Sequence, residues 1–150
     1  MMLAADAADE KERVMMAYCG GLFFLAGLAK EDIEEHMISI KKLLVFGMLA
    51  LLYFWYKESF IWQELVRRVM PGLFLLFLSW ISRESIGYGD GAAVIVLGLW
   101  TGVLFTLLTV CIGILAAGVW SMVCLIRKKT GPIPFIPFLL LGMEAALVGI

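Results

Sequence analysis

GAAVIVLGLWTGVLFTLLTVCIGILAAGVWSMVCLI, residues 91–126, contains no charged side chain and decides the class of fold. As one straight helix it would be about 54 Å long, whereas the hydrocarbon core of a bilayer is about 30 Å thick. We therefore expect two membrane-spanning helices here, divided near Leu108 or Thr109. The basic segment RKK at residues 127–129 ends the second of them.

Four further apolar runs surround this stretch, at residues 14–29, 43–56, 69–81 and 135–150. The chain is 63% hydrophobic and 17% charged, whereas soluble domains are typically about 45–50% apolar and about 25% charged. A chain of 150 residues exposes too much surface to hide that excess in a core. The sequence therefore predicts an all-α, polytopic integral membrane protein with about six transmembrane helices.

The net charge and the cysteines indicate which ligands the chain does not bind. The net charge is −1, with 12 basic and 13 acidic residues, which argues against nucleic-acid binding. The three cysteines lie separately in apolar runs and indicate packing rather than a zinc or haem site. We expect no metal and no cofactor. Residues 1–13 lack the positive start of a secretory signal, so we expect a short polar N-terminal tail followed by one membrane-embedded domain, residues 14–150.

Basic residues set the expected orientation. If the segment at residues 30–42 faces the cytoplasm, six spans place more basic residues inside than outside. The same arrangement puts the segments at residues 82–90 and 127–129 on that side of the membrane.

Three acidic residues are not explained as ordinary loop residues. Asp32 follows the first apolar run, Asp90 begins the longest one, and Glu144 lies inside the last. An ionisable group at membrane depth is costly and is a functional candidate by default.

Asp32 and Asp90 are expected on the same side of the membrane, where they could form a carboxylate pair. Two carboxyl groups that share a site cannot both ionise cheaply, so one keeps a proton and the other stays charged. The charged group can take a proton from water while the protonated one donates to a carbonyl oxygen, which is the chemistry of aspartyl peptide hydrolysis. Such a pair titrates as a unit, so no individual base is assigned. Gly87 and Gly89 precede Asp90, and without a Cβ they allow positive φ and let a substrate backbone come close to the acid.

Three segments resemble motifs of the prepilin peptidase (type IV leader peptidase) family, which are GxGD membrane aspartyl proteases. DIEEHMIS, residues 32–39, resembles the first motif, an aspartate followed after six residues by an isoleucine, here Ile38. GYGDGAAVIVLGLWTG, residues 87–102, resembles the second, in which GxGD opens an apolar helix. IPFIPFLLLG, residues 133–142, resembles the closing segment IPFxPFLxLG. The resemblance covers roughly residues 14–150 and identifies that segment as the peptidase domain.

The resemblance implies an aspartic endopeptidase that removes the leader peptide of type IV prepilins or pseudopilins. Cleavage would occur at the cytoplasmic face of a bacterial or archaeal cytoplasmic membrane. The partners would be membrane lipid and substrates with an N-terminal leader and a hydrophobic helix. Asp32 and Asp90 would be the catalytic pair. Glu144 matches no family motif, and its place inside the last apolar run makes it a candidate for supporting the pair from a neighbouring position. The residues expected to shape the substrate site are Gly87, Tyr88, Gly89, Ile38, Pro134 and Pro137.

The chain departs from the family pattern in places that bear on substrate preference. Acidic residues and His36 stand where the first motif often carries basic residues, and Ala92 replaces a lysine found in many members. The acidic cluster Glu31, Asp32, Glu34 and Glu35 is either an ordinary charged loop or a patch that attracts a basic leader. The methyltransferase region of bifunctional members is absent, so we expect no methylation of the new N-terminus.

Two alternatives remain at this point. SIGYGD, residues 85–90, also resembles the potassium-channel filter TVGYGD, in which backbone carbonyl groups of four chains replace the water around an ion. That interpretation gives no role to Asp32 or to the segment at residues 133–142. The second alternative is a non-catalytic membrane relative, in which Asp90 is an exposed interfacial residue and Asp32 belongs to a solvated loop.

Overall fold

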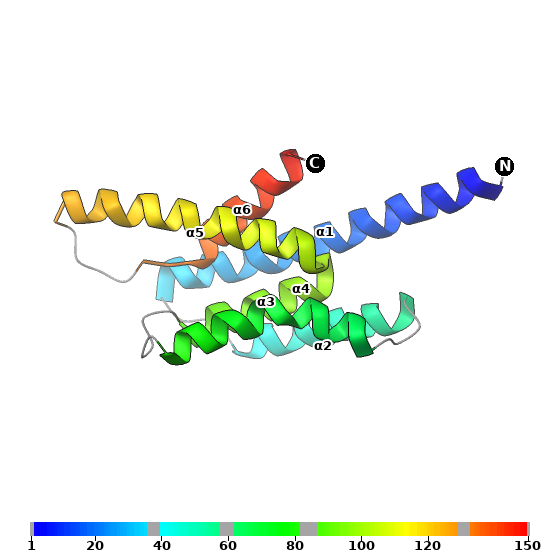
Figure 1. The fold of residues 1–150 in the computed structure, drawn as a ribbon, viewed down its shortest axis with the longest axis horizontal. Helices are drawn as coiled ribbons and strands as arrows, with labels where there is room; N and C mark the ends of the chain where they lie inside the picture. The colour runs from blue at the N-terminus through cyan, green and yellow to red at the C-terminus, as the bar shows by residue number, and fades with distance from the viewer. Residues whose placement is uncertain (1, 36–39, 58–61, 82–86, 129–132, 150) are drawn as a thin grey trace.

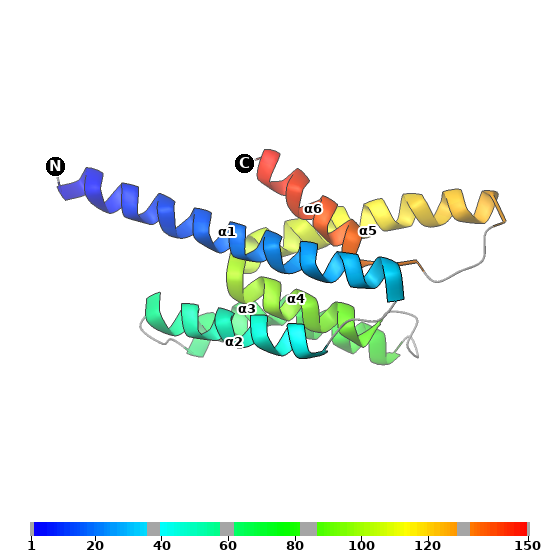
Figure 2. The same ribbon diagram turned by 180° about the vertical axis from the view of Figure 1, so that it is seen from behind.

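A computed structural model describes residues 2–35, 40–57, 62–81, 87–128 and 133–149. The described residues form six α-helices: α1 (Met2–Glu35), α2 (Ile40–Lys57), α3 (Trp62–Ile81), α4 (Tyr88–Thr101), α5 (Val103–Ile126) and α6 (Ile136–Val148). They lie in two layers, with α1, α5 and α6 in one and α2, α3 and α4 in the other (Figures 1 and 2). The prediction of an all-α fold is confirmed for this part of the chain.

Two helices are long and apolar enough to cross a bilayer among the residues described: Lys11–Glu34 within α1, and α5. The other four are shorter or carry more charge, so six transmembrane helices stay a prediction. Large apolar side chains such as Leu52, Phe74 and Leu115 are exposed on the outer faces of α2, α3 and α5. Exposed apolar surface of this extent is typical of a face that contacts lipid or another protein.

The long apolar stretch divides at Gly102, and the expected division at residues 108–109 was wrong. Gly102 has φ +83°, a conformation that favours glycine, and its N–H donates to the carbonyl of Gly98 at 3.0 Å. The Thr106 hydroxyl donates to the Gly102 carbonyl at 2.7 Å and lies 3.0 Å from the Thr101 hydroxyl. Both hydroxyl groups hydrogen-bond to backbone carbonyl groups near the break. An argument from span length does not take this local signal into account.

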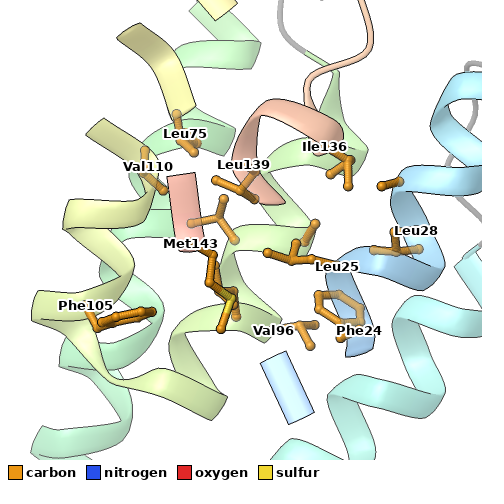
Figure 3. Packing of buried hydrophobic residues seen from close by; sticks show 14 of the residues in the cluster. Phe24, Leu25, Leu28, Leu75, Val96, Phe105, Val110, Ile136, Leu139 and Met143 are labelled. Atoms are coloured by element: carbon orange, nitrogen blue, oxygen red, sulfur yellow. The ribbon is translucent and has the colours of Figure 1, made fainter. Parts of the chain in front are cut away.

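The core lies where α1, α4, α5 and α6 meet (Figure 3). On α6, Ile136, Leu139 and Met143 are fully buried and follow a spacing of three and four residues, which places them on one face. They pack in one cluster with the fully buried side chains Phe24, Leu25 and Leu28 of α1. The start of α6 is therefore held against the last turns of α1.

Glycine residues allow two pairs of helices to approach closely. A Cβ at Gly98 of α4 would overlap the carbonyl oxygen of Arg68 on α3. A Cβ at Gly142 of α6 would overlap the carbonyl oxygen of Thr109 on α5 and lie 2.9 Å from the backbone nitrogen of Gly113. Small residues at such contacts are common where helices pack in membranes.

Arg68 connects three helices at the end of the bundle away from Asp32. Its Nε lies 3.1 Å from a carboxylate oxygen of Glu64, and its Nη1 donates to the Leu99 carbonyl at 3.3 Å. Its guanidinium also lies 5.0 Å from the ring centroid of Phe54 on α2. Because α4 ends at Thr101, the Leu99 carbonyl belongs to a last helical turn that needs partners from outside the helix.

We expect Arg68→Met to lower the free energy of unfolding by about 1–3 kcal/mol, since it leaves a partly buried carbonyl and carboxylate without this donor. Arg67→Met is the matched control, because Arg67 also pairs with Glu64 but its side chain is 67% exposed. The control should cost less than about 1 kcal/mol. Thermal unfolding in detergent micelles measures both changes, and equal losses would contradict the structural role of Arg68.

Candidate active site

Asp32 lies in the last turn of α1 and is buried, with 7% of its surface exposed. Its Oδ2 accepts a hydrogen bond of 3.0 Å from the backbone N–H of Ile136, the first residue of α6. The contact joins two segments separated by 104 residues in the sequence. Asp32 is therefore a helical residue with a specific partner, which contradicts the alternative that placed it in a solvated loop.

Asp90 lies in the first turn of α4, outside both candidate membrane helices. Its N–H donates to the Gly87 carbonyl at 3.1 Å. The pKa of Asp90 is raised from its ordinary value of 3.8 to about 7. Burial is the largest cause, the nearby charge of Asp32 adds to it, and a backbone hydrogen bond from Gly87 acts in the opposite direction. Because the charge of Asp32 raises the pKa of Asp90, the two carboxyl groups lie close enough to interact electrostatically.

The two glycines before Asp90 adopt ordinary backbone conformations. Gly87 has φ −63° and ψ 134°, an extended conformation open to any residue, and Gly89 lies within α4. Neither glycine therefore uses the positive φ that the absence of a Cβ allows. A Cβ on Gly87 would lie 3.3 Å from Oδ2 of Asp90, so glycine leaves room for the carboxyl group to fold back over the helix start.

The remaining predicted site residues are not all near the pair. Tyr88 begins α4 and is 45% exposed next to the site, whereas Ile38 lies outside the described residues. Pro134 precedes α6 and Pro137 lies in its first turn, beside the Ile136 N–H. Glu144 is exposed and stands eight residues after Ile136, about 12 Å along the helix axis. The structure therefore does not bring Glu144 to the pair.

The acidic cluster at the end of α1 is partly neutralised within the chain. Glu31 Oε1 lies 2.5 Å from Nζ of Lys42 on α2, and Asp32 is buried against α6. Glu34 is exposed. At least two of the four acids are thus engaged inside the protein, which weakens the hypothesis of a patch that attracts a basic leader.

The channel-filter alternative conflicts with the backbone at residues 88–90, which forms the first turn of α4. A filter requires successive carbonyl groups that face a pore. In a helix those carbonyl groups point along the axis toward backbone N–H groups. The geometry therefore argues against a filter in this segment.

Sequence reasoning missed the Ile136 N–H because a backbone donor has no side-chain signature. The available signal was Pro137. Proline favours the first turn of a helix, and the backbone N–H groups of that turn have no acceptor within the helix.

Comparison with known proteins gives one match. The sequence profile of the type IV leader peptidase family matches residues 19–122, a range that contains both Asp32 and Asp90 and ends before the segment at residues 133–142. Searches of curated proteins and of solved structures return no significant match.

Proposed function

The chain belongs to the type IV leader peptidase family, aspartic peptidases that cleave prepilin leaders, and from this premise we propose that Asp32 and Asp90 are its catalytic pair. The substrates would be prepilins or pseudopilins with an N-terminal leader and a hydrophobic helix. The observation that carries the proposal is the shared site itself, in which Asp32 is hydrogen-bonded and the pKa of Asp90 is raised to about 7. One carboxyl group can hold a proton near neutral pH while its neighbour is charged.

The proposed reaction uses one water molecule. The charged carboxylate takes a proton from the water molecule while the water oxygen adds to the scissile carbonyl carbon. The protonated carboxyl group gives its proton to the carbonyl oxygen. The resulting diol then breaks down. One of its hydroxyl groups returns a proton to the carboxyl group that had protonated the carbonyl oxygen, and the C–N bond breaks. The leaving nitrogen receives the proton first taken from water, so both carboxyl groups return to their starting states.

The position of the pair supports cleavage at the membrane edge. Asp32 lies near the end of a candidate membrane helix, and Asp90 lies at the start of α4, at the same end of the bundle (Figures 1 and 2). A substrate helix has no free backbone groups in the bilayer, so the scissile segment must be unwound or lie outside it. The chain is a membrane protein, and the basic residues around residues 30–42 and 127–129 support a cytoplasmic position for this end.

Co-expression with a panel of candidate prepilins tests the proposal. Loss of the leader, seen as a gel shift and confirmed by the mass of the product, is expected with wild type and not with Asp32→Asn or Asp90→Asn. Cleavage retained in either variant would rule out the pair. Potassium flux through liposomes containing the protein would instead favour the channel alternative.

We expect cleavage to decline as the pH rises through about 7. The mechanism needs a proton on one carboxyl group, and the pKa of Asp90, raised to about 7, sets where that proton is lost from the free enzyme. The sign is fixed, because a higher pH removes the required proton, so the basic limb of kcat/KM should fall near this value. A profile flat from pH 6 to 9 would contradict the role of Asp90 as proton donor.

A further inference from the structure

The Asp32 carboxylate occupies the place of a helix cap, although it comes from a distant helix. The residue before α6 is Phe135, which has no side chain able to cap a helix, and the second residue of α6 is Pro137, which has no N–H. The N–H groups of Phe138 and Leu139 both donate to the Phe135 carbonyl at 3.0 Å. The Ile136 N–H is thus a donor that the first turn of α6 leaves unused, and Asp32 accepts it.

Packing fixes the position of this donor. The Ile136 side chain is fully buried at the start of α6 and lies across from Leu28 of α1 (Figure 3). Further along α6, Gly142 rests directly on the backbone of Gly113 in α5, so the helix has little freedom to slide. Because packing fixes the position of the Ile136 N–H, this donor orients the Asp32 carboxylate as well as hydrogen-bonding to it.

The partial positive charge at the start of α6 influences which of the two aspartates holds the proton. A backbone N–H at the start of a helix favours a negative group, both by the hydrogen bond and by the helix dipole. The charged groups near Asp32 include Asp90 from α4 and Glu31 of its own helix, which pairs with Lys42 from α2. The ionisable residue of α6 is Glu144, which is exposed. The α6 helix therefore meets Asp32 with its backbone and not with a second charge.

We propose that the backbone N–H of Ile136 positions the Asp32 carboxylate and keeps it charged, so that Asp32 is the base that activates water and Asp90 carries the proton. Ile136 is a positioning residue, since it reaches the reaction through Asp32. The assignment rests on the proposed function. It resolves the pair into two roles and gives the segment IPFIPFLLLG, which lies outside the family match, a part in the chemistry.

Ile136→Pro removes the N–H at the first helical position, where proline is common, but it disfavours the αR conformation of the preceding Phe135. Ile136→Val is the comparator because it keeps the N–H while trimming the same buried side chain. Relative to Ile136→Val, we expect Ile136→Pro to lower kcat about 10²-fold with little change in KM, since the base is misplaced while the substrate site is intact. The acid limb of the pH profile should also move to higher pH. A merely structural role for Ile136 would change the amount of folded enzyme and leave that limb in place.

A second measurement does not depend on cleavage. Asp32→Ala should lower the melting temperature in the Ile136→Val background, because it leaves a buried N–H without this acceptor. The same replacement should cost at most half as much in the Ile136→Pro background, where no N–H exists. Equal losses in the two backgrounds would overturn the contact. Unequal losses with an unmoved acid limb would overturn its role in the charge of Asp32. If wild type cleaves no prepilin, the proposed function fails, and these melting temperatures still decide the contact.

Discussion

Asp90→Asn is expected to lower the rate of leader cleavage by about 10³-fold or more, while the folded protein accumulates in the membrane at the level of wild type. The loss follows because an amide cannot give a proton to the scissile carbonyl oxygen, and general acid and base groups typically contribute about 10²–10⁴-fold. The fold should tolerate the change. Since the pKa of Asp90 is raised to about 7, the native group is largely neutral below that pH, and asparagine replaces it with a neutral group of the same shape.

The two aspartates should differ when truncated to alanine. Asp90→Ala removes a half-buried group that interacts unfavourably with Asp32 when charged, whereas Asp32→Ala removes the acceptor of the Ile136 N–H. We therefore expect Asp32→Ala to reduce the melting temperature more than Asp90→Ala, although both abolish cleavage. Melting curves in detergent, recorded at pH 6, test the difference, and the opposite order would contradict the structural account of the pair.

Gly142→Ala is expected to lower the free energy of unfolding by about 1–3 kcal/mol, the usual cost of overpacking a tight contact. The new methyl group would meet the carbonyl oxygen of Thr109 and the backbone of Gly113, and neither is a flexible side chain that can move aside. The α6 helix must shift away from α5. Cleavage per folded molecule should fall as well, because the same helix presents its first N–H to Asp32.

Gly118→Ala is the matched control on the neighbouring helix. A Cβ at Gly118 has nothing within 4 Å, so alanine should be neutral or should stabilise the helix by about 0.5–1 kcal/mol. Unfolding and cleavage are measured on both variants in the same detergent. If Gly142→Ala behaves like Gly118→Ala, the close approach of α5 and α6 is not a feature of the folded protein.

Much of the fold could be predicted from hydropathy, because charged and glycine-rich segments separate the apolar runs. The runs at residues 14–29, 43–56 and 69–81 lie within α1, α2 and α3, whereas the run at 91–126 covers most of α4 and all of α5. The positions of Asp32 and Asp90 at the ends of apolar runs are what suggested a pair. The break was predicted too far along the chain because apolar helices carry little local signal. The features that mark its true position are Gly102 and the hydroxyl groups of Thr101 and Thr106. The start of α1 was also unexpected, since the polar residues 2–13 continue the helix.

The details of the site depended on tertiary contacts that no spacing encodes. The family pattern predicted that Gly87 matters but not that its lack of a Cβ makes room for the carboxyl group of Asp90. In the segment at residues 133–142, the residues expected to shape the site were Pro134 and Pro137. Its described contact with Asp32 is instead made by a main-chain atom of Ile136, and main-chain atoms are common to every sequence.

The hydrogen bond between Asp32 and Ile136 also has a consequence for the order of synthesis. The two residues leave the ribosome 104 positions apart, which at about 5–20 residues per second is an interval on the order of 5–20 s. Both aspartates are translated before α6, the helix whose first N–H Asp32 accepts. On the proposed assignment, a nascent chain that has made α1 to α4 therefore holds both aspartates without the contact that positions Asp32. Hydrolysis would begin only when the last helix has docked, so unfinished copies would not cut the proteins around them.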